Sequence, residues 1–251
     1  MDQSEILRKL KSLSNPEAVA GMARFGIHEK RAYGVAIPVL RRLAKQIGKN
    51  RPLAQQLWSS GILEARVLAS LIDDPARVTE AQMERWSKDF RSWAVCDGCC
   101  ANLFDKTKWA YQKAVEWSGR KEEFVKRGGF VLMAALAVHD KKARNSQFLR
   151  FLPLITREAQ DERNFVRKGV NWALRQIGKR NAVLNQAAIR LARAVQKIDS
   201  RSARWIAADA LRELTSRKIQ ERVGAQPPAG MGRQRKTYGK KLTGVDEKTR
   251  G

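Results

Sequence analysis

The sequence FVRKGVNWALRQI, residues 165–177, carries the pattern that decides the fold of this chain. Its apolar residues recur at spacings of three and four, which places them together on one face of an α-helix. The same spacing runs through residues 53–58, 62–72 and 124–138. Short breaks that contain Gly, Pro or Asn separate these segments, and runs that alternate in the manner of a strand are absent from the sequence. The pattern predicts an all-α protein.

Four predicted helices contain similar segments, which indicates an internal repeat. The segments are EARVLA at 64–69, FVKRGG at 124–129, FVRKGV at 165–170 and SARWIA at 202–207. A basic residue is the third or fourth residue of each segment, at intervals of 61, 41 and 36 positions: Arg66, Arg127, Lys168 and Arg204. Intervals of about 30–45 residues are typical of stacked helix pairs. We therefore predict a helical-repeat solenoid, an α-α superhelix, with these basic residues on one face; a generic helical bundle is the alternative.

The charge of the chain points to a polyanionic partner. Fifty Lys and Arg residues stand against 25 Asp and Glu residues, a formal net charge of +25 over 251 residues. Displacing condensed counterions from DNA or RNA would supply affinity without sequence recognition. Nucleic acid is the predicted partner. A merely soluble basic protein and a surface that touches anionic lipid are the alternatives.

The sequence offers no candidate membrane anchor and no metal site. Its longest wholly apolar run, residues 130–138, is too short to span a bilayer, and residues 1–5 lack the order of a signal peptide. The three cysteines all lie within residues 96–100, which is no disulfide framework. The two histidines, His28 and His139, are too distant in sequence to suggest a zinc site with them. We predict a cytoplasmic protein without bound metal.

The composition changes near Arg222. Residues 221–251 carry 8 basic and 3 acidic residues and almost no large apolar ones, so burial cannot offset the entropy lost on ordering them. We predict a folded domain over residues 1–220 and a basic, disordered tail over residues 221–251. The tail either adds a nonspecific grip on nucleic acid or only keeps the protein soluble.

The sequence SWAVCD, residues 92–97, places an aromatic ring and a carboxylate on one helix face. Trp93 and Asp97 are four positions apart, the spacing of neighbours on an α-helix. A carboxylate in so basic a chain indicates a site that handles a cation within nucleic acid. Without further evidence, Asp97 could instead be a surface carboxylate or one that pairs two helices, and Trp93 could instead be a core residue.

Several segments together resemble the AlkD-like DNA alkylation repair proteins. The matching segments are MARF at 22–25, YGVAIPVLR at 33–41, Trp93-x-x-x-Asp97, FVKR at 124–127 and FVRKGVNWALR at 165–175. The likeness covers roughly residues 10 to 215 in the same order. It implies a HEAT-like solenoid that cradles duplex DNA containing alkylated bases. It also implies a monomeric, monofunctional glycosylase that excises cationic N3- and N7-alkylated purines without any cofactor, and that is nucleoid-associated when bound to DNA.

The resemblance also assigns roles to residues. Asp97 matches the catalytic carboxylate, Trp93 and Trp172 match its aromatic walls, and Arg127 matches a residue that binds the DNA backbone. Arg175 is a second candidate for a phosphate contact, beside the repeated basic residues Arg66, Lys168 and Arg204. The chain departs from the family where relatives carry an aromatic residue, an acidic residue and a tyrosine: here these are Ser92, Ala94 and Phe25.

A carboxylate suits this chemistry. A cationic alkylpurine leaves as a neutral base, so positive charge moves onto the sugar as the bond breaks, and Asp97 would stabilise that transition state. Two unit charges 4 Å apart attract by about 4 kcal/mol at an effective dielectric near 20. If half of this is gained only in the transition state, the rate rises on the order of 30-fold. A non-catalytic binder of DNA or RNA and a protein-interaction scaffold are the alternative functions.

Overall fold

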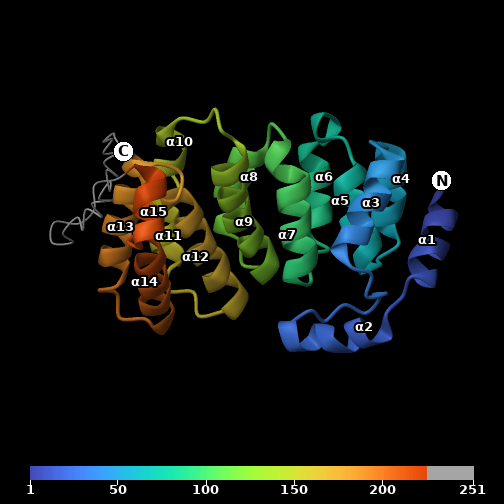
Figure 1. Ribbon diagram of the computed structural model, residues 1–251, viewed down its shortest axis with the longest axis horizontal. Coiled ribbons are helices and arrows are strands. Elements are labelled where there is room, and N and C mark those ends of the chain that lie inside the picture. Colours follow the sequence, from blue (N-terminus) through green and yellow to red (C-terminus); the bar gives the residue numbers. More distant parts are fainter. Residues whose placement is uncertain (225–251) are drawn as a thin grey trace, which may run out of the picture.

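In the computed structural model, residues 1–224 are described, and all regular structure in that range is helical (Figure 1). The elements run in chain order as α1 (Gln3–Ser12), α2 (Pro16–Met22), the short turn η1 (Ala23–Phe25), α3 (Ile37–Ile47), α4 (Arg51–Ser59), α5 (Leu63–Ile72), η2 (Pro75–Arg77), α6 (Glu80–Ser87), α7 (Trp93–Asn102), η3 (Phe104–Lys106), α8 (Ala110–Ser118), α9 (Glu123–His139), α10 (Asn145–Leu149), α11 (Leu152–Glu158), α12 (Asn164–Gly178), α13 (Ala182–Val195), α14 (Arg201–Leu214) and α15 (Arg217–Val223).

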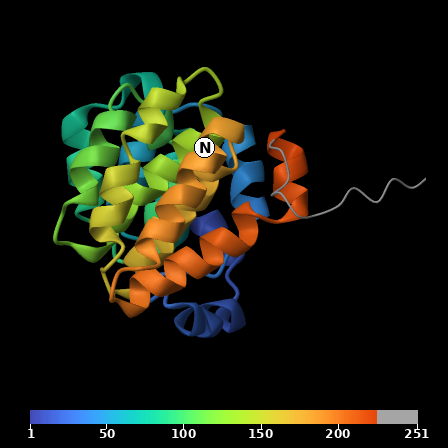
Figure 2. The same ribbon diagram turned by 90° about the vertical axis from the view of Figure 1, so that its left-hand side faces the viewer.

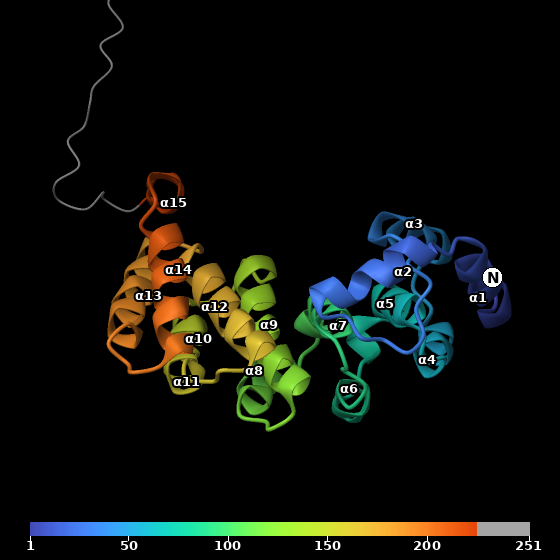
Figure 3. The ribbon, with the colours of Figure 1, turned by 90° about the horizontal axis from the view of Figure 1, so that it is seen from below.

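The helices form two layers that follow the chain from end to end. In the inner layer each helix packs on the next, in the order α3, α5, α7, α9, α12 and α14. The outer layer contains α4, α6, α8, α11 and α13, which lie along the opposite side (Figure 3). Viewed from the end that carries α13 and α14, the successive pairs stand behind one another (Figure 2). This arrangement confirms the predicted helical-repeat solenoid.

The predicted breaks begin helices for identifiable reasons. The side chains of Asn15, Asn50 and Asn181 each accept a hydrogen bond from the backbone N–H three residues on, and each residue directly precedes a helix. These caps satisfy amides that have no partner inside the helix. Pro16 and Pro52 lie in the first turns, where the missing N–H of proline leaves no hydrogen bond unmade.

One hydrophobic core runs through the whole stack. The rings of Trp58 and Trp86 stack with centroids 3.9 Å apart, which joins α4 to α6. Trp86 in turn contacts Phe104, and Phe104 contacts Trp117 of α8. The aromatic chain therefore links three consecutive repeats through their buried sides.

An extended segment, residues 23–36, leaves the N-terminal end of the stack and is named here the strap. The buried carboxylate of Glu64 accepts hydrogen bonds from three consecutive strap amides, those of Tyr33, Gly34 and Val35, at 2.9, 2.6 and 3.3 Å. Helix α2, which precedes the strap, contributes no buried side chain. The strap is thus held by a charged hydrogen-bond acceptor rather than by a core of its own.

None of the helices in residues 1–224 combines the length and the apolar character that crossing a bilayer requires. The last described helix, α15, continues past the predicted domain boundary at residue 220 and ends at Val223. The predicted tail falls almost entirely on residues 225–251, which lie outside the described residues. The division of the chain at residue 220 therefore stays a prediction.

Candidate functional site

Three neighbouring inner helices bring Asp97, Arg127 and Lys168 together. Each residue lies four positions after the first residue of its helix, in α7, α9 and α12 respectively. Because α7 packs on α9 and α9 on α12, residues at this equivalent place lie side by side across the layer. The repeat thus converts a recurring sequence position into a row in space.

Asp97 and Arg127 form a bidentate ion pair. Arg127 Nε donates to Asp97 Oδ1 at 2.8 Å, and Nη2 donates to Oδ2 at 2.7 Å. The third nitrogen, Nη1, donates to the backbone carbonyl of Phe165 at 2.7 Å. The Arg127 side chain is 8% exposed and that of Asp97 is 18% exposed, so the pair is largely withdrawn from water. The parallel geometry is the strongest that these two groups form.

Burial and pairing act in opposite directions on the two charges. Burial raises the pKa of Asp97, and the hydrogen bonds and charge of Arg127 oppose that rise without cancelling it. Burial alone would lower the pKa of Arg127, but Asp97 outweighs it and the pKa is raised. A guanidinium does not lose its proton under ordinary conditions, so the carboxylate beside it is ionised near neutral pH. Burial also raises the pKa of the neighbouring Cys96 thiol, which makes it a poor nucleophile.

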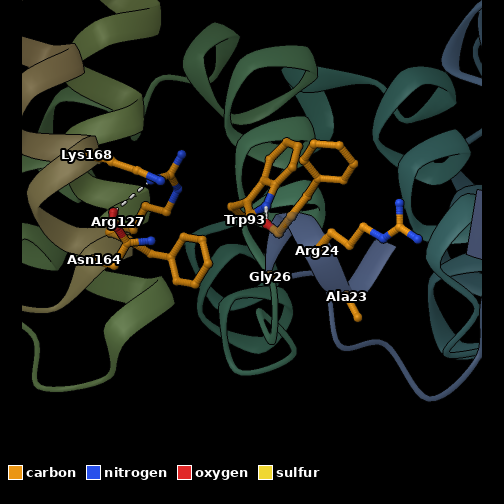
Figure 4. Close-up of a pocket in the computed structure, with 9 residues that line it drawn as sticks. Ala23, Arg24, Gly26, Trp93, Arg127, Asn164 and Lys168 are labelled. Carbon is orange, nitrogen blue, oxygen red and sulfur yellow. Dashed lines mark hydrogen bonds between the residues drawn. The ribbon is translucent and has the colours of Figure 1, made fainter. Parts of the chain in front are cut away.

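An open cavity of about 520 Å³ lies between these helices and the strap (Figure 4). On the helix side it is lined by Trp93, Arg127, Asn164, Phe165 and Lys168, and on the strap side by residues 23–26. The Lys168 ammonium lies 6.0 Å from the centre of the Phe165 ring. Asp97 is not among the lining residues, but it is paired with Arg127, which is. The wall therefore presents cations and aromatic rings, and one of the cations is bound to a carboxylate.

Two contacts hold the strap against the cavity. Trp93 Nε1 donates to the backbone carbonyl of Phe25 at 2.8 Å, which leaves the Phe25 ring 69% exposed. Gly26 has a φ of 72°, and a Cβ there would lie 2.3 Å from Phe165 Cζ. Only glycine permits both this backbone conformation and this close approach.

Comparison with known proteins identifies the family. The model of a family described as DNA alkylation repair enzyme matches residues 6–214. The chain belongs to this DNA alkylation repair family. The match confirms the resemblance drawn from the sequence. An uncharacterized protein of Listeria innocua, Lin0241, is 25% identical over 194 residues, which are 76% of this chain and 84% of that protein.

A solved structure supports the fold of this DNA alkylation repair protein. It is described as "a new family of proteins related to the HEAT-like repeat DNA glycosylases with affinity for branched DNA structures". The likeness has a TM-score of 0.73 at 19% identity and covers 90% of this chain and 98% of that chain. At this identity the likeness establishes the HEAT-like fold, which was predicted, and not a shared activity.

The residues predicted to be catalytic, Asp97, Trp93 and Trp172, are only partly brought together. Trp93 and Arg127 line the cavity, and Asp97 contacts Arg127. Trp172 lies on α12 four residues beyond Lys168, half-buried against the core and outside the cavity lining. Its role as a second aromatic wall stays a prediction.

The other predicted DNA contacts differ in how free their charges are. Arg175 is paired with Asp209 at 2.8 Å and also contacts Glu213. Arg66 is largely buried, 3.4 Å from Asp89 and over the Trp58 ring. Arg204 is exposed and pairs with Asp199 at 2.9 Å. Lys168 forms no salt bridge within residues 1–224 and is the predicted cation most available to a phosphate.

Several residues of the site were not singled out from the sequence. Asn164 and Phe165 line the cavity from the first turn of α12, and Arg24 and Gly26 line it from the strap. A signal for Phe165 was present, since Phe124 opens the equivalent segment of α9 and the two rings lie 5.3 Å apart. Gly26 carried no such signal, because its neighbour is far away in the sequence.

The departures from the family pattern have structural consequences. Ser92, where relatives carry an aromatic residue, donates through Oγ to Glu29 Oε1 of the strap at 2.6 Å. Phe25, where relatives carry a tyrosine, cannot donate or accept a side-chain hydrogen bond.

In the described part of the chain, no group of three or more His, Cys, Asp and Glu side chains is placed to hold a metal ion.

Proposed function

We propose that the protein is a DNA glycosylase that hydrolyses the N-glycosidic bond of positively charged N3- and N7-alkylated purines in duplex DNA. The observation that carries the proposal is the placement of Asp97. It shares a helix face with Trp93 and is paired with Arg127, and both of these residues line a cavity whose walls are cationic and aromatic. The membership of the chain in a DNA alkylation repair family supports the same substrate class.

The main requirement of this reaction is a negative charge close to the sugar. The bond between C1′ and the base nitrogen breaks with both electrons leaving on the base, which departs neutral. Water adds to C1′ and releases a proton. Positive charge builds on the sugar in between, so a carboxylate nearby stabilises the transition state more than the ground state. Trp93 contributes an electron-rich face, which favours a cationic sugar by roughly 0.5–2 kcal/mol.

Arg127 sets a condition on this mechanism. While its guanidinium holds Asp97, the two charges largely cancel at the distance of a sugar in the cavity. A DNA phosphate entering the cavity would compete with Asp97 for the N–H groups of Arg127, as Arg binds phosphate and carboxylate with similar geometry. Lys168 and Arg24 line the same cavity and would hold that phosphate. DNA binding would thus loosen the ion pair and expose the carboxylate.

The ion pair also favours a second candidate, a DNA binder without glycosylase activity. A carboxylate that accepts two hydrogen bonds from a buried arginine is satisfied structurally without any substrate. In that case Asp97 only fixes Arg127 for a phosphate contact. The two candidates make opposite statements about base release.

Release of free base from methylated duplex DNA tests the proposal. The parent protein should release N3-methyladenine or N7-methylguanine, and Asp97→Asn should reduce the single-turnover rate by about 30-fold or more. Glu17→Gln removes the same charge from an exposed side chain of α2 that forms no salt bridge within residues 1–224, and it should leave the rate unchanged. DNA affinity, measured for all three proteins, separates a loss of chemistry from a loss of binding. No release from a parent protein that binds duplex DNA would establish the second candidate instead.

A further inference from the structure

A second cavity, of about 300 Å³, lies at the opposite ends of the same helices α9 and α12. Four basic side chains line it: Lys141, Lys179, Arg180 and Arg222. They come from the loop after α9, the junction of α12 with α13, and the last turn of α15. No Asp or Glu is among its lining residues. The first cavity has three basic lining residues, Arg24, Arg127 and Lys168, and one of them, Arg127, is held by the bidentate contact with Asp97.

Arg180 is held in place before any ligand arrives. Its Nη1 donates to the carbonyl of Ala137 at 3.0 Å and its Nη2 to the carbonyl of Ala143 at 3.1 Å. The guanidinium also lies 4.5 Å from the centre of the Phe148 ring, a favourable cation–π distance. These contacts use two of its five N–H groups. A fixed guanidinium with spare donors is suited to a phosphate oxygen.

The acids nearest to this cavity are occupied elsewhere. Asp140 Oδ1 accepts from the backbone amides of Lys142 and Ala143, and Oδ2 accepts from the Tyr111 hydroxyl at 2.9 Å. Glu213 pairs with Lys179 but is shared with Arg175. Within residues 1–224, Lys141 and Arg222 form no salt bridge. The cavity therefore keeps an excess of positive charge.

Helix dipoles account for only part of that excess. The C-terminus of a helix carries the equivalent of about half a negative charge, so cations in a last turn are stabilising. Three helices, α9, α12 and α15, end at this cavity and together offset about 1.5 of its four charges. The N-terminus of α13 at Asn181 adds back about half a positive charge, so with Glu213 shared between two partners roughly two to three positive charges remain for a ligand.

We propose that this cavity binds phosphodiester groups of DNA, as a second backbone contact on the helix pair that also forms the first cavity. From Arg127 to Ala137 along α9 is about 15 Å at 1.5 Å per residue. Phosphates of one strand follow each other by about 3.4 Å along a duplex axis, so this separation would span about four to five nucleotides of a duplex aligned with α9. The proposal rests on DNA binding and not on glycosylase chemistry.

The salt dependence of affinity for undamaged duplex DNA tests this proposal. Each lost phosphate contact lowers the slope of log K against log salt by about 1. Lys141→Ala combined with Arg222→Ala should therefore reduce the magnitude of the slope by about 2. The matched control, Arg190→Ala with Arg193→Ala, removes the same charge from exposed positions on the outer helix α13 and should change the slope much less. Unchanged circular dichroism establishes that each variant is folded.

Two results would overturn the proposal. An unchanged slope in the Lys141 and Arg222 variant would mean that DNA does not reach the cavity. An equal decrease in the control would mean that only the overall charge matters. Titration with inorganic phosphate distinguishes a DNA phosphodiester from a free phosphate ion as the ligand. If the variant loses phosphate binding but keeps the DNA slope, the cavity binds a small anion and the proposed DNA contact is wrong. None of these readouts uses damaged DNA, so they are independent of whether base release occurs.

Discussion

At the residue scale, the ion pair of Asp97 and Arg127 combines structural and functional demands. Two charges that are 18% and 8% exposed have lost most of their hydration, and each compensates the other. Removing one partner of a buried pair leaves a charge without compensation, whereas removing both removes the problem. The two side chains should therefore be strongly coupled in stability as well as in any chemistry.

A double-mutant cycle measures this coupling. Arg127→Met should lower the free energy of unfolding by about 3–5 kcal/mol, because Asp97 is then buried alone. Adding Asp97→Asn should restore part of that loss, so that the double variant is more stable than the sum of the two single effects. Urea denaturation of the four proteins gives the comparison. Additive effects within about 0.5 kcal/mol would show that the pair contributes no coupling in solution.

The sequence allowed Asp97 and Trp93 to be singled out, because their relation is local to one helix. It allowed Arg127 to be chosen as a basic residue but not as the partner of Asp97. That pairing depends on the register between α7 and α9, which residues 30 positions apart do not encode in any short pattern. Gly26 escaped for the same reason, since the Phe165 ring that excludes a side chain there belongs to α12.

At the element scale, the contact between α8 and α9 depends on a single glycine. A Cβ at Gly129 would lie 2.5 Å from Ser118 N and 3.0 Å from the carbonyl oxygen of Ala114. These are backbone atoms of the neighbouring helix and cannot move aside as a flexible side chain does. The adjacent Gly128 faces side chains instead, none closer than 3.4 Å to its added Cβ.

Alanine at these two positions should act in opposite ways. Gly129→Ala should destabilise the protein by about 1–3 kcal/mol or more, because α8 and α9 must separate to admit the methyl group. Gly128→Ala, in the same helix turn, should be neutral or stabilising by up to about 1 kcal/mol, since alanine favours the helical backbone. Thermal unfolding of the two variants provides the measurement. Equal destabilisation by both would contradict the close approach of α8 and α9 at Gly129.

Helices were predictable where apolar periodicity is long, as in α9, α12 and α14. The strap was not, because residues 23–36 have no periodic pattern and make no core of their own. Its path is decided by contacts with distant residues, above all the three amides bonded to Glu64. In the sequence, Glu64 is indistinguishable from an exposed charged residue of a helix. Only the fold shows that its side chain is buried.

At the scale of the whole molecule, the strap joins inner helices that are far apart in the stack, across the first cavity. It is bound to α5 at Glu64, to α7 at Trp93 and to α12 at Phe165. The cavity wall is therefore complete only when the strap is in place. Arg24, Lys30 and Arg31 lie on the strap and make it open to trypsin whenever it lifts.

Gly26→Ala should displace the strap without unfolding the solenoid. The added Cβ meets Phe165 and also forces an alanine into a left-handed conformation, a strain of roughly 1–2 kcal/mol. Cleavage of the native protein at Arg24, Lys30 or Arg31 should then become about tenfold faster or more. Gly48→Ala is the control, because Gly48 has a φ of 71° but open space around it. Similar strap cleavage in both variants would mean that the contact with Phe165 does not hold the strap.

The closure by Gly26 and Phe165 has a further consequence for cooperativity. In a linear stack of repeats each unit is stabilised only by its neighbours, so either end can unravel by itself. The contact between Gly26 and Phe165 joins the segment before α3 to α12, so the helices between them are connected both through the stack and through the strap. Local unfolding at the N-terminal end then removes a contact from α12, near the other end. The two regions should therefore unfold together rather than independently.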